Sequence, residues 1–237
     1  NAELTQFAYI ASHDLQEPLR KIRVFNQLVG KSLEDTTSKT MEYVEKIDNA
    51  SGRMTTLIRD ILKYSELSDS EDKFSTVKLC DIVDEVRADF ELLIEQKNAV
   101  VICSSLPEVK AVPLQMSQLF SNLISNALKF SKQDIAPKVE IRARKMTYDE
   151  VSSNERMDSL NAYYTITVSD NGIGFNPENA ERIFAIFQRL HSKTNYVGTG
   201  IGLAICKKIV HNHHGDINVT SKPGEGTVFQ IVLPASE

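Results

Sequence analysis

The feature that most constrains this 237-residue chain is a long run of apolar residues near its N-terminus, spaced alternately three and four apart. This spacing is typical of a coiled-coil seam and predicts one long amphipathic helix over 3–33. At about 100° per residue, His13 points away from the seam, toward solvent. Pro18 falls inside the predicted helix and should kink it, because proline removes a backbone hydrogen bond. The seam consists of Leu4, Ala8, Ala11, Leu15, Ile22, Phe25 and Val29.

A second seam with the same spacing follows over 41–67, after a polar break at 33–40. Two such helices joined by a short loop form an antiparallel hairpin, which is too thin to bury two full stripes. We therefore expect two copies of the chain to associate as a homodimer with a four-helix bundle. The alternative is that the stripes pack on the remainder of the same chain. The second seam consists of Val44, Ile47, Ser51, Met54, Ile58, Ile61 and Ser65.

Composition and charge exclude several classes of protein. A net charge of -5 argues against a general nucleic-acid binder, which needs a basic face. The chain has no apolar run of 18 residues and opens with no secretory signal, and its start at Asn1 suggests a fragment of a longer protein. Its three cysteines, Cys80, Cys103 and Cys206, lie far apart among apolar residues, so we expect reduced thiols in a cytoplasmic protein.

The remaining chain mixes helical and strand patterns after an acidic, polar stretch at 66–75. We therefore predict a helical hairpin over 1–67, a linker over 68–75 and a second domain over 76–237. The order of elements in the second domain favours an α+β fold, an α/β sandwich with a mixed sheet and helices on one face. A polar insertion at 147–161 is expected to be a disordered surface loop. Helices are predicted at 77–98, 114–131, 178–187 and 200–215, and strands at 99–106, 138–146, 162–171, 216–222 and 226–234.

The segment NLISNALKF places Asn122, Asn126 and Lys129 four and three residues apart, on one face of a helix. Amide oxygens suit a Mg²⁺ ion that keeps most of its waters, and a lysine supplies a point charge for phosphate. Two asparagines inside a helix are disfavoured by helix propensity, which argues against mere surface residues.

Two glycine-rich stretches add to this pattern. In DNGIGF (170–175), Asp170 can accept a hydrogen bond from an exocyclic amine, and Gly172 and Gly174 let the backbone approach a flat ring. GTGIGLAI (198–205) opens a predicted helix whose N–H groups can face phosphates. Between them, 181–197 has the pattern of a mobile lid. HNHH (211–214) is interpreted as solvated histidines at a helix end, with a metal site as the alternative.

In this order and spacing, these motifs resemble the transmitter core of sensor histidine kinases, over nearly the whole chain. FAYIASHDLQEPLRKI resembles the H box, NLISNALKF the N box and DNGIGF the first glycine box. IFAIFQRLH resembles the phenylalanine box, and GTGIGLAI the second glycine box. The segment HDLQEPL is most similar to the corresponding segment of the kinases that follow phytochrome-like sensory modules.

The resemblance implies ATP and Mg²⁺ as cofactors, an upstream sensory domain absent from this chain, and a response-regulator receiver domain as partner. It implies that ATP occupies a Bergerat-type pocket, that His13 attacks the γ-phosphorus, and that Asp14 takes or orients the Nδ1 proton. Asn126 would bind Mg²⁺. The residues implied to contact the nucleotide are Asn122, Asn126, Lys129, Asp170, Gly172, Gly174, Arg189, Gly198, Thr199, Gly200, Gly202, Leu203 and Thr227.

Three questions follow from the sequence: whether the chain has phosphatase activity, whether it is a kinase or only a scaffold, and whether it is another kind of ATPase. Many family members carry Thr or Asn four residues after the histidine, where this chain has Glu17. A carboxylate cannot donate a hydrogen bond to an attacking water, so phosphatase activity is in question, although Glu17 can equally form an ion pair with Arg20 or Lys21. The chain can also be a nucleotide-binding dimerisation scaffold without kinase activity. An ATPase of the gyrase type is disfavoured, because Asn122 stands where those enzymes place a glutamate base.

Overall fold

The structure, a computed structural model, describes residues 19–30, 38–67, 74–152, 157–158, 161–190 and 199–235. His13, Asp14, Glu17 and Gly198 lie outside these ranges. Chain contacts divide the described residues into a helical unit up to Leu67, with 199–201 grouped to it, and an α/β unit that holds the rest. The two units are described separately below.

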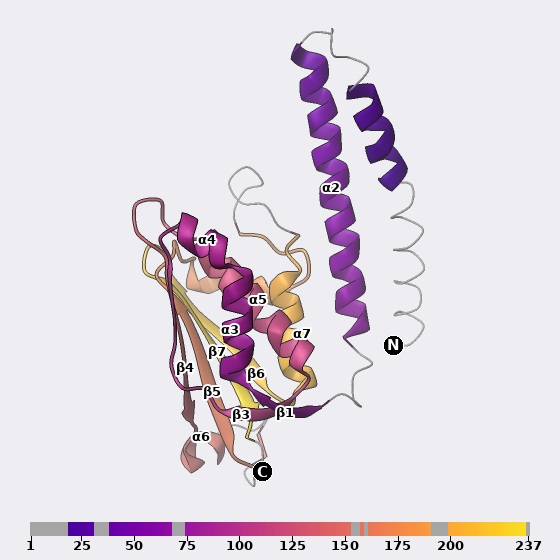
Figure 1. Cartoon of the computed structure of the whole chain (residues 1–237). Coiled ribbons are helices and arrows are strands. Elements are labelled where there is room, and N and C mark those ends of the chain that lie inside the picture. Colours follow the sequence, from indigo (N-terminus) through magenta and orange to yellow (C-terminus); the bar gives the residue numbers. More distant parts are fainter. Residues whose placement is uncertain are drawn as a thin grey trace. The chain divides into compact units, whose positions relative to one another are not determined.

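The helical unit is a pair of antiparallel helices (Figure 1). Residues 19–30 are helical, and α2 (Ser38–Glu66) begins three residues before the predicted 41. The Asn26 side-chain amide donates to the Val44 carbonyl oxygen at 2.6 Å, and Arg23 Nε lies 3.4 Å from Asp48 Oδ1. These contacts confirm the expected hairpin.

The two predicted seams are only partly covered within this hairpin. Leu19, Ser51 and Ile58 are buried. By contrast, apolar side chains of both seams remain exposed in the single chain, including Ile22, Phe25, Val29, Ile47 and Met54. An exposed apolar stripe of this length is what a bundle-forming hairpin presents.

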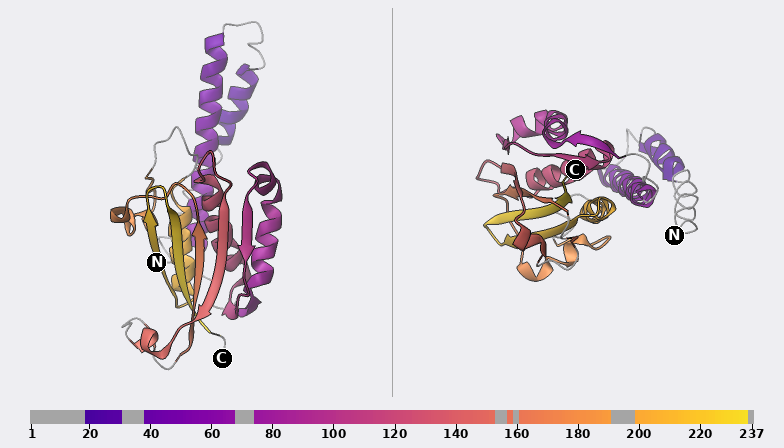
Figure 2. Two further views of the ribbon diagram at one scale, coloured as in Figure 1. Left: turned by 90° about the vertical axis from the view of Figure 1, so that its left-hand side faces the viewer. Right: turned by 90° about the horizontal axis from the view of Figure 1, so that it is seen from below.

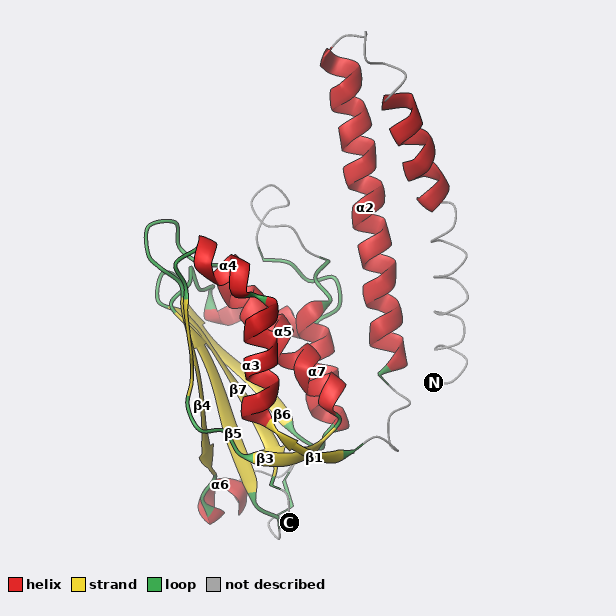
Figure 3. Cartoon of the chain, viewed as in Figure 1, coloured by secondary structure: helices red, strands yellow, loops and turns green. Residues whose placement is uncertain are grey.

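The α/β unit is built on a five-stranded sheet with strand order β2-β4-β5-β7-β6 (Figures 1 and 3). Strand β2 pairs with β4 in parallel and all other neighbours are antiparallel, which confirms the predicted mixed sheet. The strands are β2 (Val100–Cys103), β4 (Lys138–Lys145), β5 (Tyr163–Asp170), β6 (Asp216–Lys222) and β7 (Gly226–Pro234).

Three helices cover one face of this sheet: α3 (Leu79–Asp89), α5 (Pro113–Lys129) and α7 (Gly202–Asn212) (Figure 2). Helix α5 is central and contacts both of the others. Its apolar stripe, with Met116, Leu119 and Phe120, is fully buried. Residues Ile141, Ile166 and Ile231 supply the facing layer from the sheet, so helices and sheet share one core.

The segment expected to be one helix over 77–98 differs from that prediction. A short strand, β1 (Ser75–Lys78), pairs antiparallel with β3 (Glu108–Ala111), and α3 follows it directly. The helix breaks at Phe90 before α4 (Glu91–Gln96). The predicted linker over 68–75 therefore overlaps this strand at Ser75.

Two other segments correct the sequence-based expectation. Part of the 147–161 insertion is ordered: α6 (Tyr148–Ser152) buries Val151 against Tyr163 and Val232 on the sheet face away from α3, α5 and α7. The predicted helix over 178–187 is instead two 3₁₀ turns, η2 (Pro177–Asn179) and η3 (Arg182–Phe184). Within the described ranges, no helix is both long and apolar enough to cross a membrane.

Candidate nucleotide-binding site

Asp170 ends strand β5 and is held in place by two backbone groups. Its Oδ1 accepts hydrogen bonds from the N–H of Gly172 at 2.8 Å and the N–H of Thr227 at 3.2 Å. Burial raises the pKa of this carboxyl, and the two N–H groups oppose that rise. With Oδ1 engaged twice, Oδ2 is the oxygen left to accept a hydrogen bond from a ligand.

The glycines of the 170–175 loop are required by close backbone packing. A Cβ on Gly172 would lie 2.6 Å from the Phe130 carbonyl oxygen, at the end of α5. Gly174 has a φ of +60°, and a Cβ there would lie 2.0 Å from the Lys222 carbonyl oxygen on β6. The Ile173 N–H also donates to the Phe130 carbonyl at 2.9 Å. The loop is therefore clamped between α5 and the β6–β7 hairpin.

Ser221 was not identified from the sequence, yet it supports this loop from β6. Its buried hydroxyl accepts the Phe175 N–H at 3.0 Å and donates to the Gly226 carbonyl at 2.7 Å. It also lies 3.0 Å from the Thr227 hydroxyl. A serine in an alternating strand gives no sequence signal for this role, because all of its partners are distant in the chain or across a turn.

Helix α5 presents Asn122, Asn126 and Lys129 along one half-buried face, as predicted. The Asn122 Nδ2 is buried and faces the thiol of Cys206 on α7, where it opposes the rise in the pKa of that thiol that burial causes. A Cβ on Gly202, the first residue of α7, would lie 3.3 Å from Asn122 Oδ1, so the start of α7 lies against this face. The Asn122 Oδ1, on the side of Gly202, is an amide oxygen suited to the waters of a hydrated Mg²⁺.

Two cations meet at the end of the same face. Burial lowers the pKa of Lys129, and the neighbouring positive charge of Arg189 lowers it further. The Lys129 ammonium also lies 4.6 Å from the centroid of the Phe130 ring. Two like charges held near each other destabilise one another unless an anion joins them, which makes this a candidate phosphate-binding position.

The remaining predicted contacts are placed as follows. Leu203 is the second residue of α7, beside Gly202, and Thr227 is joined to Asp170 as described. Thr199 and Gly200 are grouped with the helical unit, where Gly200 has a φ of +77°. The α/β unit therefore brings together Asp170, Gly172, Gly174 and Thr227 in one cluster, and Asn122, Lys129, Arg189 and Gly202 along α5.

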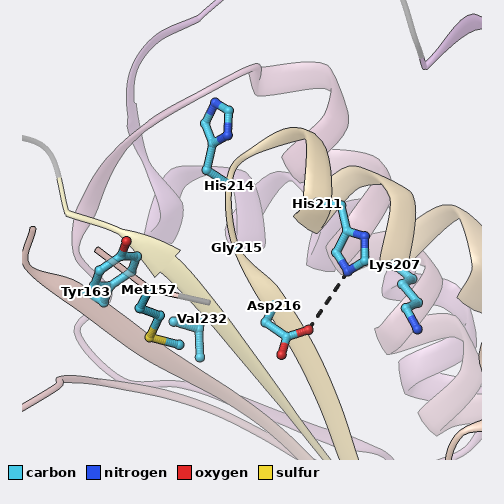
Figure 4. A pocket seen from close by; sticks show the side chains of 8 residues that line it. All are labelled: Met157, Tyr163, Lys207, His211, His214, Gly215, Asp216 and Val232. Carbon is cyan, nitrogen blue, oxygen red and sulfur yellow. Dashed lines mark ion pairs between the residues drawn. The ribbon is translucent and has the colours of Figure 1, made fainter. Parts of the chain in front are cut away.

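The structure contradicts the interpretation that the histidines of 211–214, at the end of α7, are all solvated. His213 is not solvated: its side chain is 3% exposed, and its Nε2 accepts the Val112 N–H at 3.0 Å while Nδ1 lies 2.7 Å from the Ile209 carbonyl. His211 is exposed and lies 3.9 Å from Asp216. Figure 4 shows His211, Lys207 and Asp216 around a shallow pocket that contains none of the predicted nucleotide contacts. Among the described residues, no cluster suited to a metal ion is found.

Comparison with known proteins agrees with this arrangement. Residues 111–237 match the family described as histidine kinase-, DNA gyrase B- and HSP90-like ATPases. Residues 3–70 match the phospho-acceptor domain of histidine kinases. The chain therefore belongs to the histidine kinase-, DNA gyrase B- and HSP90-like ATPase family, and the two domains in this order make it the core of a sensor histidine kinase.

Its curated relatives include the phytochrome-like protein Cph1 of Synechocystis, 38% identical over 99% of this chain. Cyanobacterial phytochrome A of Nostoc is 39% identical over the same share. The chain spans 29% of the length of each of these relatives.

Among solved structures, full-length ShkA in complex with AMPPNP has a TM-score of 0.69 and 22% identity, covering 98% of this chain and 46% of that one. The catalytic domain of histidine kinase ThkA has a TM-score of 0.53 and 25% identity, covering 68% of this chain and 95% of that one. The first likeness supports the fold of nearly the whole chain, and the second that of the α/β unit.

Proposed function

We propose that this chain is an ATP-dependent kinase core that phosphorylates its own His13 and passes the phosphoryl group to an aspartate of a response-regulator receiver domain. The proposal rests on the two backbone hydrogen bonds that hold the Asp170 carboxylate. A half-buried carboxylate with one oxygen fixed by two backbone N–H groups offers its second oxygen to the amino group of adenine. The glycines beside it let the loop pack directly against the Phe130 and Lys222 carbonyl oxygens, which holds the carboxylate in position.

The α5 face supplies the groups for the triphosphate. Lys129 and Arg189 would neutralise phosphate charge, and the Asn122 amide oxygen would accept a hydrogen bond from a water of the bound Mg²⁺. Asn126 would offer its amide oxygen as a ligand for Mg²⁺, which supplies charge neutralisation across the phosphates when bound. Gly198, Thr199, Gly200, Gly202 and Leu203 would close the phosphate end through the lid and the start of α7.

The reaction proposed for His13 is an in-line displacement at the γ-phosphorus. The Nε2 lone pair forms the N–P bond while the bond to the bridging β,γ-oxygen breaks, and ADP leaves with that electron pair. Asp14 would hold the Nδ1 proton, which keeps the neutral tautomer reactive before attack and stabilises the imidazolium afterward. Positioning supplies most of the rate enhancement in reactions of this kind.

We further propose that the helical hairpin forms a homodimer, since apolar seam residues such as Phe25 and Ile47 are exposed in one chain. A four-helix bundle from two hairpins would bury them. The sensory domain would lie in the part of the protein that precedes this chain, as the 29% coverage of the phytochrome relatives suggests, and the core would act in the cytoplasm.

The direct test of the function is transfer of label from γ-labelled ATP. With Mg²⁺ present, the chain should incorporate label from γ-labelled but not from α-labelled ATP. Adding a receiver domain from a two-component system should then move the label to that partner. Binding of ATP without incorporation would contradict kinase activity and favour the scaffold.

A further inference from the structure

Two of the three cysteines, far apart in the sequence, come together in the fold. Cys80 lies in the first turn of α3, and Cys103 ends the edge strand β2. Helix α3 packs against β2, and the loop after β2 returns past the start of that helix. Both side chains are partly exposed, whereas Cys206 is fully buried inside α7.

Hydrogen bonds show how closely the two thiols converge. Cys103 Sγ lies 3.4 Å from the Ser104 carbonyl oxygen, and Cys80 Sγ lies 3.9 Å from the same atom. The Leu106 N–H donates to Cys80 Sγ at 3.2 Å, which fixes the position of that sulfur. Two thiols directed at a single carbonyl oxygen are neighbours, and they are so without any cross-link.

The titration of one thiol is sensitive to the other. Burial raises the pKa of Cys103 to about 11, and the adjacent Cys80 sulfur contributes to that rise. Cys103 is therefore protonated at neutral pH and is a poor nucleophile. Cys103 is thus the thiol that is disfavoured as the first to react with an oxidant.

We propose that Cys80 and Cys103 form a redox-active dithiol, a modification site that a small hydroperoxide converts into an intrachain disulfide. The Cys80 sulfur attacks one peroxide oxygen as its thiol proton leaves, the O–O bond breaks, and the departing hydroxide takes up that proton, so that a sulfenic acid and one water form. The Cys103 sulfur then attacks the sulfenic sulfur, the S–O bond breaks, and a second water leaves. Two thiols lose two protons and two electrons, and one hydrogen peroxide becomes two waters.

The site is distinct from the nucleotide cluster and does not depend on the proposed kinase activity. A disulfide here would tie the first turn of α3 to the end of β2. Cys80 follows β1 by two residues, and β1 is the first described element after the helical hairpin. The cross-link would therefore also restrain β1. Disulfides in reducing compartments are typically transient and sensory, which fits a partly exposed pair.

The test is peptide mapping of the whole chain after treatment with a small excess of hydrogen peroxide, without reductant. We expect the intact mass to fall by about 2 Da and one new cross-linked peptide pair joining Cys80 and Cys103, reversed by dithiothreitol. The unfolding midpoint should rise by roughly 5–10 °C in the oxidised chain. The Cys206→Ala variant is the control and should form the same disulfide.

The single variants separate the two steps. Cys103→Ser should stop at a sulfenic acid on Cys80 that dimedone traps, and Cys80→Ser should resist mild oxidation. Three outcomes would overturn the proposal: a persistent sulfenic acid on Cys80 in the wild-type chain, a disulfide that includes Cys206, or cross-linking between two chains in place of the intrachain bond.

Discussion

The backbone N–H of Thr227 donates a hydrogen bond to Oδ1 of Asp170 at 3.2 Å, although 57 positions separate the two residues. They are register partners where β5 and β7 pair, so the sheet itself sets this contact. A shift of register by one residue would turn the carboxylate to the other face of the sheet. The geometry of the candidate adenine site is thus a property of strand pairing rather than of a flexible loop.

Replacing Asp170 with Asn should weaken ATP binding with little loss of stability. If the amide oxygen keeps the two N–H groups, its NH₂ faces the adenine amino group, and two donors then oppose each other. We expect an affinity loss of about 10–100-fold, or roughly 1.5–3 kcal/mol. Calorimetry with ATP would measure it. Asp134→Asn, at an exposed position of the same unit, makes the same charge change and should bind as the wild type does.

Gly174→Ala should destabilise the α/β unit by more than about 2 kcal/mol, because the new Cβ collides with the Lys222 carbonyl oxygen at a φ of +60°. Gly224 is the matched control. It has a φ of +79°, but a Cβ added there would have nothing within 4 Å, so Gly224→Ala should cost only about 1 kcal/mol. Urea denaturation of both variants gives the comparison, and equal losses would contradict the clamped loop.

His213 should make stability depend on pH. Burial lowers the pKa of this histidine below its ordinary value of 6.5, so the unfolded chain binds the proton more tightly than the folded chain. The stability that the neutral ring contributes is full above pH 6.5 and is lost as the pH falls from there toward the folded pKa. The advantage of the wild type over His213→Gln, about 1–3 kcal/mol at pH 7.5, should therefore shrink on acidification to pH 5.5.

Denaturation curves at several pH values would measure this difference. His211→Gln keeps the buried ring and its two backbone contacts, so it should retain the pH dependence of the wild type. A constant gap between the wild type and His213→Gln across this range would contradict a buried neutral histidine.

Phe25→Glu should prevent dimerisation. Phe25 is 64% exposed in the single chain and lies in the apolar seam, so a carboxylate there would be buried without a partner in the bundle. Sedimentation equilibrium should give a dimer for the wild type and a monomer for the variant. Leu92→Glu is the control: Leu92 is 73% exposed, on α4 of the other unit, and its change should leave the dimer intact. A dimeric Phe25→Glu chain would place the interface elsewhere.

Long periodic segments were predictable because their signal is local. The seam of α2, the stripe of α5 and the alternation of β4, β5 and β7 each repeat over many residues. Strands β1 and β3 were missed because each is four residues long and is stabilised by a partner 30 or more positions away. The break at Phe90 involves neither glycine nor proline, so nothing in the local sequence marks it.

The residues of the candidate site fall into the same two groups, those with a local sequence signal and those without one. Asp170 and the α5 side chains could be chosen by residue type and spacing, whereas Ser221 acts only through partners that pairing of β6 with β7 supplies. The burial of His213 does have a sequence signal, although the polar residues around it obscure that signal. It continues the buried spacing of Cys206 and Ile209 on α7, which favours an inward position despite three neighbouring polar residues.

The most direct test of the central claim is the chemistry of the label after incubation with γ-labelled ATP and Mg²⁺, compared between the intact chain and His13→Gln. The account predicts label on the intact chain alone, lost in acid and kept in base as a phosphoramidate is, with ATP affinity unchanged in the variant. Equal label on both chains, or label that survives acid, would contradict His13 as the phosphoacceptor.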